Sequence, residues 1–252
     1  MCSSDLAGYN ATGSGNTFVG SQAGEGGTSS APYSSGQSNT AVGYQALKGF
    51  TTGTNNTVLG REALKSMTAG SGMIVIGYQA GQSISTSGQT ESSIIIGKQA
   101  GDGGSGRMRE AVIIGAEAFR SSGGTDVTGA IAIGFRASYS ATTSTDIAIG
   151  YNALYSSAGF GQNVAIGYYA GQNVNDATYG GGVYIGYEAA RFASKNTGIY
   201  RGVAIGAHAG QNSPVATSVF VGNQSGRYAR SGSANVYIGY RSGYGGNTSS
   251  PY

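Results

Sequence analysis

Short apolar runs that end in glycine recur along the whole chain. Each copy reads as Asn or a small residue, three mostly apolar residues, Gly, Tyr or a polar residue, a second polar residue, and Ala or Ser, as in residues 39–46 and 163–170. Neighbouring copies are 16 to 23 residues apart. The thirteen copies are centred on Gly20, Gly43, Gly60, Gly77, Gly97, Gly115, Gly134, Gly150, Gly167, Gly186, Gly206, Gly222 and Gly239.

Each copy predicts a short strand, a corner at the glycine, a short second strand and a variable loop. Val, Ile and Thr fill the first strand and favour extended backbone, and four to five residues are too few for a helix. Segments rich in Gly, Ser and Thr separate the copies, as at residues 85–93 and 121–129. Such composition is typical of turns and loops.

Stacking of the copies predicts the fold. A strand pair of this size cannot bury its apolar face alone, so successive copies must pair as the coils of a solenoid, about 4.8 Å apart. We therefore predict an all-β protein, a parallel β-solenoid of about thirteen coils. Residues 7–252 are predicted to be a single repeat domain that is truncated at both ends, and residues 1–6 a non-native leader.

The alternation of side chains in the first strand predicts self-association. Its first and third residues share one face, and the second residue lies on the opposite face and is apolar in all thirteen copies. An apolar row of this length needs a cover, for which another copy of the chain is the simplest source. The predicted subunit contact is Phe18, Ala41, Val58, Val75, Ile95, Ile113, Ala132, Ala148, Ala165, Tyr184, Ala204, Phe220 and Tyr237.

The repeats resemble those of a known family. The Asn-Val-Ala-Ile-Gly of residues 163–167 resembles the Asn-Ser-Val-Ala-Ile-Gly repeat in head domains of trimeric autotransporter adhesins. The Tyr-Gln-Ala of residues 78–80 is similar to repeats of phage tail-fibre-like proteins. The resemblance implies a left-handed parallel β-roll with three chains around a threefold axis, located outside the cell on a virion tail or a bacterial surface.

Charge and composition exclude several partners. The net charge of +3 arises from 14 basic and 11 acidic side chains scattered singly along the chain, so we expect no nucleic-acid partner. A single cysteine excludes an internal disulfide and a cysteine-based metal cluster. No apolar run is long enough to predict insertion into a membrane.

The inventory of titratable groups predicts no enzyme, no cofactor and no metal. Catalysis needs convergent titratable groups, and the chain has one histidine and eleven carboxylates. His208 is predicted to be an exposed member of a mixed column two residues after the glycines. Glu62, Glu117 and Glu188 share that column but are three or four coils apart, so they cannot flank one glycosidic bond within a chain. Pairing across subunits stays open.

Tyrosine is the residue with the clearest functional pattern. The tyrosines directly after the glycine have two interpretations, a packing ladder of stacked rings or a surface that contacts sugars or another fibre. They are Tyr44, Tyr78, Tyr151, Tyr168, Tyr187 and Tyr240.

The expected function is a non-enzymatic fibre segment that spaces or presents a host-binding or glycan-binding surface. Its expected partners are two further copies of the chain in a homotrimer and a cell-surface glycan. Two alternatives stay open. One is an extracellular filament that assembles by end-to-end stacking, and the other is a glycan-degrading, tailspike-like enzyme.

Overall fold

The computed structural model describes residues 6–27, 34–84, 90–103, 106–120, 126–141, 145–159, 161–176, 180–192, 202–213, 217–230 and 234–245. Most of the predicted leader, residues 1–5, therefore lies outside the described residues. The described residues contain strands and turns but no helix, and every strand pairing is parallel. The chain divides into two compact units, Met1–Ile133 and Gly134–Tyr252.

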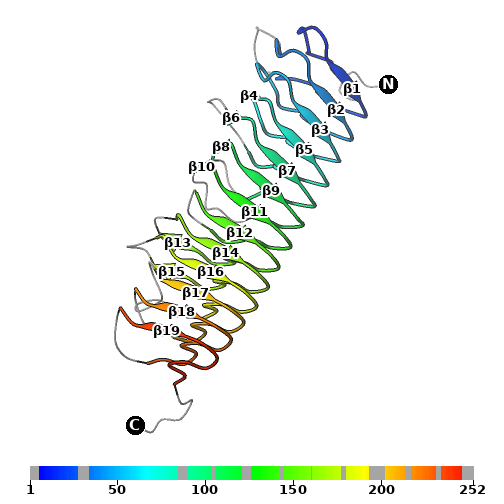
Figure 1. The fold of residues 1–252 in the computed structure, drawn as a ribbon. Helices are drawn as coiled ribbons and strands as arrows, with labels where there is room; N and C mark the ends of the chain where they lie inside the picture. The colour runs from blue at the N-terminus through cyan, green and yellow to red at the C-terminus, as the bar shows by residue number, and fades with distance from the viewer. Residues whose placement is uncertain are drawn as a thin grey trace. The chain divides into compact units, whose positions relative to one another are not determined.

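The first unit contains one long parallel sheet and two small ones (Figure 1). The long sheet runs in chain order through β1 (Thr17–Val19), β2 (Thr40–Val42), β3 (Thr57–Leu59), β5 (Ile74–Ile76), β7 (Ile94–Ile96), β9 (Val112–Ile114) and β11 (Ile131–Ile133). Two-residue strands form the small sheets: β4 (Gly70–Ser71) with β6 (Thr90–Glu91), and β8 (Met108–Arg109) with β10 (Val127–Thr128).

The second unit repeats the arrangement. Its long sheet runs through β12 (Ile147–Ile149), β14 (Val164–Ile166), β16 (Val183–Ile185), β17 (Val203–Ile205), β18 (Val219–Val221) and β19 (Val236–Ile238). Its small sheet pairs β13 (Ala158–Gly159) with β15 (Asn175–Asp176). Equivalent repeat positions lie opposite each other, as Ala148 does opposite Ala165 and Ala165 opposite Tyr184.

The predicted fold class, an all-β parallel β-solenoid, is confirmed, but the predicted number of coils is not. The solenoid has about 9 turns, fewer than the thirteen coils predicted. Each of the thirteen repeats supplies a strand, whereas the segment that returns to the next strand includes, in several repeats, residues outside the described ranges.

The predicted second strand after the glycine is wrong, because these residues form consecutive turns. In the coil that begins at Gly43, Gln45 and Leu47 adopt φ values of 56° and 52°, which are left-handed and incompatible with a strand. The Gln45 N–H still donates to Ser21 O at 3.0 Å, and the Leu47 N–H donates to Ala63 O at 2.9 Å. The turns are therefore hydrogen-bonded from coil to coil, like the strands.

The corner itself requires glycine for two reasons. Gly77 and Gly167 both have φ of 138°, a backbone conformation that side chains oppose. A Cβ atom on either glycine would also lie 2.5 Å from the carbonyl oxygen of the next corner, Gly97 or Gly186. The positive φ and the close approach of successive corners together explain why the motif has glycine there.

The core of each coil is formed by the middle residue of the long-sheet strand and the residue four after the glycine. In some coils the two volumes are complementary. Ala41 accompanies Leu47 and Ala148 accompanies Leu154, and all four are buried. In the coil of Phe220 the second position is Gly226, where any side chain would overlap the Phe220 ring.

A ladder of buried amides joins the residues that precede the strands. Asn39 Nδ2 donates to Asn16 Oδ1 at 3.1 Å, and Asn56 Nδ2 donates to Asn39 Oδ1 at 2.9 Å. The Met73 N–H donates to Asn56 Oδ1 at 3.0 Å and ends this run of side-chain bonds. In the second unit the buried Asp146 accepts the Asn163 N–H at 2.8 Å. An amide here both donates and accepts, so it satisfies buried polar groups in two coils.

Candidate functional site: the sheet face and the turn face

The outer face of each long sheet is apolar and uncovered by the described residues of its unit. The first and third residues of each strand point away from the core, and Leu59 and Ile74 are 47% and 40% exposed. Ile166 and Ile205 are each 37% exposed. We call these two columns the sheet face: Thr17, Val19, Thr40, Val42, Thr57, Leu59, Ile74, Ile76, Ile94, Ile96, Val112, Ile114, Ile131 and Ile133 in the first unit, and Ile147, Ile149, Val164, Ile166, Val183, Ile185, Val203, Ile205, Val219, Val221, Val236 and Ile238 in the second.

The subunit contact that the sequence predicted is wrong. The middle residues point into the core of their own chain, and those between the first and last strands are buried, so they cannot reach another subunit. Phe18, on β1, and Tyr237, on β19, are half-buried and pack against Phe50 and Phe220. The positions that were wrongly predicted to contact another subunit are Phe18, Ala41, Val58, Val75, Ile95, Ile113, Ala132, Ala148, Ala165, Tyr184, Ala204, Phe220 and Tyr237.

A second surface is formed by the turns that follow the corner glycines. We call it the turn face: residues 21–27, 44–50, 61–67, 78–84, 98–103 and 116–120 in the first unit, and 135–141, 151–157, 168–174, 187–192, 207–213, 223–230 and 240–245 in the second. Backbone hydrogen bonds hold successive turns in register. In the second unit the Tyr169 N–H donates to Tyr151 O at 2.9 Å, and the Glu188 N–H donates to Tyr168 O at 2.8 Å.

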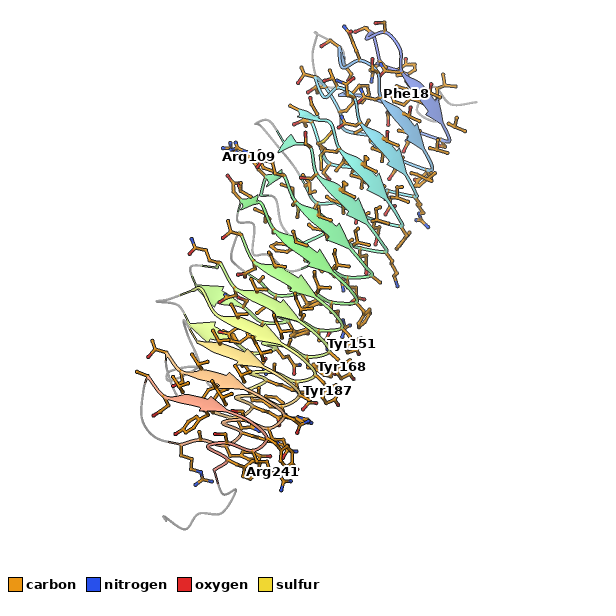
Figure 2. All side chains as sticks on the ribbon, in the orientation of Figure 1. Phe18, Arg109, Tyr151, Tyr168, Tyr187 and Arg241 are labelled. Carbon is orange, nitrogen blue, oxygen red and sulfur yellow. The ribbon has the colours of Figure 1, made fainter. Side chains whose placement is uncertain are left out.

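Three of the predicted tyrosines form a stacked row on the turn face of the second unit. Figure 2 shows Tyr151, Tyr168 and Tyr187 along one edge of the solenoid. The ring centroids of Tyr151 and Tyr168 are 5.1 Å apart, and those of Tyr168 and Tyr187 are 5.3 Å apart with an interplanar angle of 1°. Phe135 extends the stack, 5.2 Å from Tyr151. The three tyrosines are about two-fifths to one-half exposed.

Stacking decides which part of each ring a ligand can reach. Both faces of Tyr151 and of Tyr168 lie against neighbouring rings, so these residues present ring edges and hydroxyl groups outwards. The other predicted tyrosines contact arginine. The Arg61 guanidinium carbon lies 5.5 Å from the Tyr44 ring centroid and 5.8 Å from that of Tyr78, and the Arg241 carbon lies 5.3 Å from that of Tyr240.

The three glutamates of the polar column are bound by nearby donors. Glu62 accepts from Gln79 Nε2 at 2.8 Å, which lowers the pKa of Glu62 together with the nearby Lys65 and Arg61 charges. Glu117 lies 3.7 Å from Arg120. Glu188 is buried and accepts from both Arg191 and Gln211. These donors stabilise carboxylates as structural acceptors.

His208 is less exposed than the sequence predicted. Its side chain is 24% exposed, with Nδ1 3.4 Å from Glu188 Oε2. The ring lies edge-on to Tyr187 at a centroid distance of 5.2 Å. Among the described residues, no group of His, Cys, Asp and Glu could hold a metal ion. The described part of the chain also contains no helix that could cross a membrane.

The two turn faces differ in charge, which inspection of the linear sequence missed. In the first unit the face has Lys48, Arg61, Lys65, Lys98 and Arg120 beside Glu25, Glu62, Asp102 and Glu117. In the second unit it has Arg136, Arg191, Arg227, Arg230 and Arg241, and the only carboxylate among these described turns is Glu188. Cations that are dispersed along the sequence thus share one surface, because each lies in a turn that follows a corner glycine, one to eight residues after it.

Comparison of the chain with protein-family models, curated proteins and solved structures finds no match. The structure supports a repeat protein with a parallel β-solenoid fold. The resemblance to adhesin heads and tail fibres therefore rests on the repeat motif alone.

Proposed function

We propose that the chain is a non-enzymatic segment of a homotrimeric fibre, of the kind found in phage tail fibres and bacterial surface adhesins. The observation that carries the proposal is the apolar sheet face. Monomeric proteins rarely expose continuous apolar patches larger than a few hundred Å². The second unit alone places twelve aliphatic side chains on this face, two from each of six strands. Such a surface is typical of a subunit interface.

Another copy of the same chain fits this surface better than an unrelated partner. The 26 positions of the sheet face contain Val, Ile, Leu and Thr and no charged residue, so identical chains would not oppose like charges. Every copy also carries the same row spacing, about 4.8 Å between strands. Parallel chains related by cyclic symmetry could therefore pack their rows side by side along the whole sheet.

The number of chains and the extracellular setting come from the repeat motif. The Asn-Val-Ala-Ile-Gly of residues 163–167 resembles repeats whose family forms threefold β-rolls. In such an assembly the sheet faces meet at the threefold axis, and the turn faces stay outside. The segment would then act as a stiff spacer that presents its turn face to a host or glycan surface.

The mass of the chain in solution tests the proposal. We expect multi-angle light scattering on the full chain to give the mass of three chains. The double variant Ile166→Glu/Ile205→Glu should give one chain, because it buries unpaired charge at the interface. The double variant Ile166→Ser/Ile205→Ser adds no charge, and we expect it to weaken the trimer while preserving the coil, because both residues lie outside the core.

A matched control adds the same charge elsewhere. Gln162 and Asn223 are exposed and lie outside the sheet face, so Gln162→Glu/Asn223→Glu should leave the trimer intact. A monomeric wild-type chain, or a trimer that survives both sheet-face variants, contradicts the proposal. Masses that grow without limit with concentration would favour a filament instead, and release of oligosaccharides from bacterial polysaccharide would favour an enzyme.

A further inference from the structure

We propose that the turn face of the second unit binds a linear anionic polysaccharide, with arginine side chains and tyrosine hydroxyls as the contacts. The inference deepens the proposed function by naming the ligand class of the exposed surface, and it rests on that surface facing outwards. The geometry within the second unit carries the argument.

The first observation is the excess of positive over negative side chains on this face. Five arginines share it with a single described carboxylate, Glu188, which accepts hydrogen bonds from Arg191 and Gln211. The turn face of the first unit is different, since Lys48 pairs with Glu25 at 3.2 Å and Arg120 with Glu117 at 3.7 Å. A ligand that follows positive charge would therefore select the second unit.

The second observation is the way aromatic rings hold the guanidinium groups. The guanidinium carbon of Arg136 lies 4.9 Å from the Phe135 ring centroid and 5.3 Å from that of Tyr139. The carbon of Arg241 lies 5.3 Å and 5.4 Å from those of Tyr240 and Tyr244. A guanidinium that rests over a ring keeps its charge, and its orientation is partly fixed before a carboxylate or sulfate arrives.

The third observation is the stacked row of Tyr151, Tyr168 and Tyr187. The outward edges of stacked rings carry the positive part of the ring quadrupole, and the phenol groups donate hydrogen bonds. Both features favour acceptor-rich ligands such as sugars with acidic groups. Nucleic acid is disfavoured, because bases bind single-strand sites by stacking on open aromatic faces. In this row both faces of Tyr151 and Tyr168 are occupied by neighbouring rings.

The fourth observation is the regular spacing along the unit. Turn-to-turn hydrogen bonds continue from the His208 N–H to Tyr187 O at 2.8 Å and from the Arg241 N–H to Asn223 O at 3.0 Å. Equivalent positions therefore recur at each coil, and weak contacts can add along an extended chain. An extended acidic polymer can therefore reach arginines and tyrosines in several coils, which a compact ligand cannot.

Binding of defined polymers to the full chain tests the inference. The probes are alginate for carboxylate groups, dextran sulfate for sulfate groups, uncharged dextran, and a single-stranded thymidine oligonucleotide. We expect alginate or dextran sulfate to bind, with an affinity that falls as salt is raised, and dextran to bind weakly or not at all. Failure of both acidic polysaccharides to bind, or tighter binding of the oligonucleotide at equal charge concentration, overturns the inference.

Two triple variants locate the site. Arg136→Gln/Arg227→Gln/Arg241→Gln removes three cations from the turn face of the second unit, and Arg61→Gln/Lys65→Gln/Lys98→Gln removes three from that of the first. We expect the variant of the second unit to bind polysaccharide about tenfold more weakly, because each exposed ionic contact contributes only a small factor to the affinity. The variant of the first unit should change the affinity little, because its cations lie outside the proposed site. Equal losses in both variants would show a general charge effect and contradict the site.

Two further measurements separate other causes of failure. If the arginine-to-glutamine variant loses its cooperative thermal transition, Arg136→Lys/Arg227→Lys/Arg241→Lys keeps the charge and is expected to bind less tightly than wild type, because lysine lacks the planar fork. Light scattering on the same samples reports the oligomer separately. A trimer that binds no acidic polysaccharide would overturn this inference while leaving the proposed fibre segment in place.

Discussion

At the residue scale, the corner glycines set how closely coils can approach. Gly167 combines a φ of 138° with a neighbouring carbonyl oxygen, that of Gly186, 2.5 Å from where a Cβ atom would be. Gly129 provides a contrast, with a φ of 69° and no atom within 4 Å of the corresponding position. Comparison of the two glycines therefore separates the effect of steric overlap from the effect of backbone conformation.

Alanine at these glycines should therefore have different costs. We expect Gly167→Ala to destabilise the fold by about 2–4 kcal/mol, because a coil must shift as well as adopt a strained backbone. Gly129→Ala should lower the stability by about 1 kcal/mol, because alanine must adopt the left-handed conformation but overlaps no other atom. Thermal or urea unfolding of the two variants measures the difference, and equal losses would show that the close approach of the corners is unimportant.

The lowered pKa of Glu62 predicts a pH effect at the same scale. The hydrogen bond from Gln79 favours the charged carboxylate in the folded chain. The resulting stability is present above the pKa of the unfolded chain and is lost as pH falls through the lower pKa of the folded chain. Between neutral pH and pH 3, the melting temperature of wild type should fall more than that of Glu62→Gln. The difference between the two falls should be at most about 3 °C. Parallel melting curves for both proteins would contradict this role.

At the element scale, some coils match a strand residue to a turn residue by volume. Phe220 lies beside Gly226, whereas at the equivalent positions Ala41 lies beside Leu47 and Ala148 beside Leu154. Leu47 and Leu154 have φ values of 52° and 46°, close to the 61° of Gly226, so leucine tolerates this backbone. The two arrangements are alternative ways to fill one interior.

A double-mutant cycle tests this matching. Phe220→Ala should destabilise the protein by about 3–5 kcal/mol by leaving a cavity. Gly226→Leu should destabilise it by overlap with the Phe220 ring. The double variant Phe220→Ala/Gly226→Leu recreates the Ala41 and Leu47 pairing, and we expect it to be more stable than the sum of the single effects by about 1–3 kcal/mol. Additive losses would contradict matched packing.

The repeat, the strand and the corner could be predicted from sequence because each is encoded locally. Alternation shows which residues share a face, but it does not show which face is inside, and the prediction for Ala148 and Ala165 was wrong for that reason. Their small size was the available signal, since a thin coil cannot enclose large side chains at every middle position. The turns at Gln45 and Leu47 could not be foreseen, because these residue types seldom adopt left-handed backbone.

At the scale of the whole molecule, the sheet face links stability to concentration. If other chains cover residues such as Ile166 and Ile205, folding and association are coupled by mass action. We expect the melting temperature of wild type to rise by a few degrees for each tenfold increase in protein concentration. A tenfold change in concentration corresponds to about 1.4 kcal/mol of free energy, which shifts the melting temperature by roughly that amount. Ile166→Glu/Ile205→Glu should melt at a temperature independent of concentration. Scanning calorimetry over two decades of concentration makes the comparison, and a constant wild-type value would contradict coverage by other chains.

The register of the strands also determines how the length of the protein can change. Thr57 lies opposite Thr40 on one side and Ile74 on the other, so deletion of residues 44–60 would bring Ile74 against Thr40 without altering the pattern of either strand. Asn39 Oδ1 now accepts a hydrogen bond from the Asn56 N–H, and Asn56 Oδ1 accepts one from the Met73 N–H. After the deletion, Asn39 Oδ1 would accept the bond from the Met73 N–H instead. We therefore expect deletion of this repeat to preserve the strand register and the amide ladder. Recombination between repeats could therefore lengthen or shorten the protein in steps of one coil.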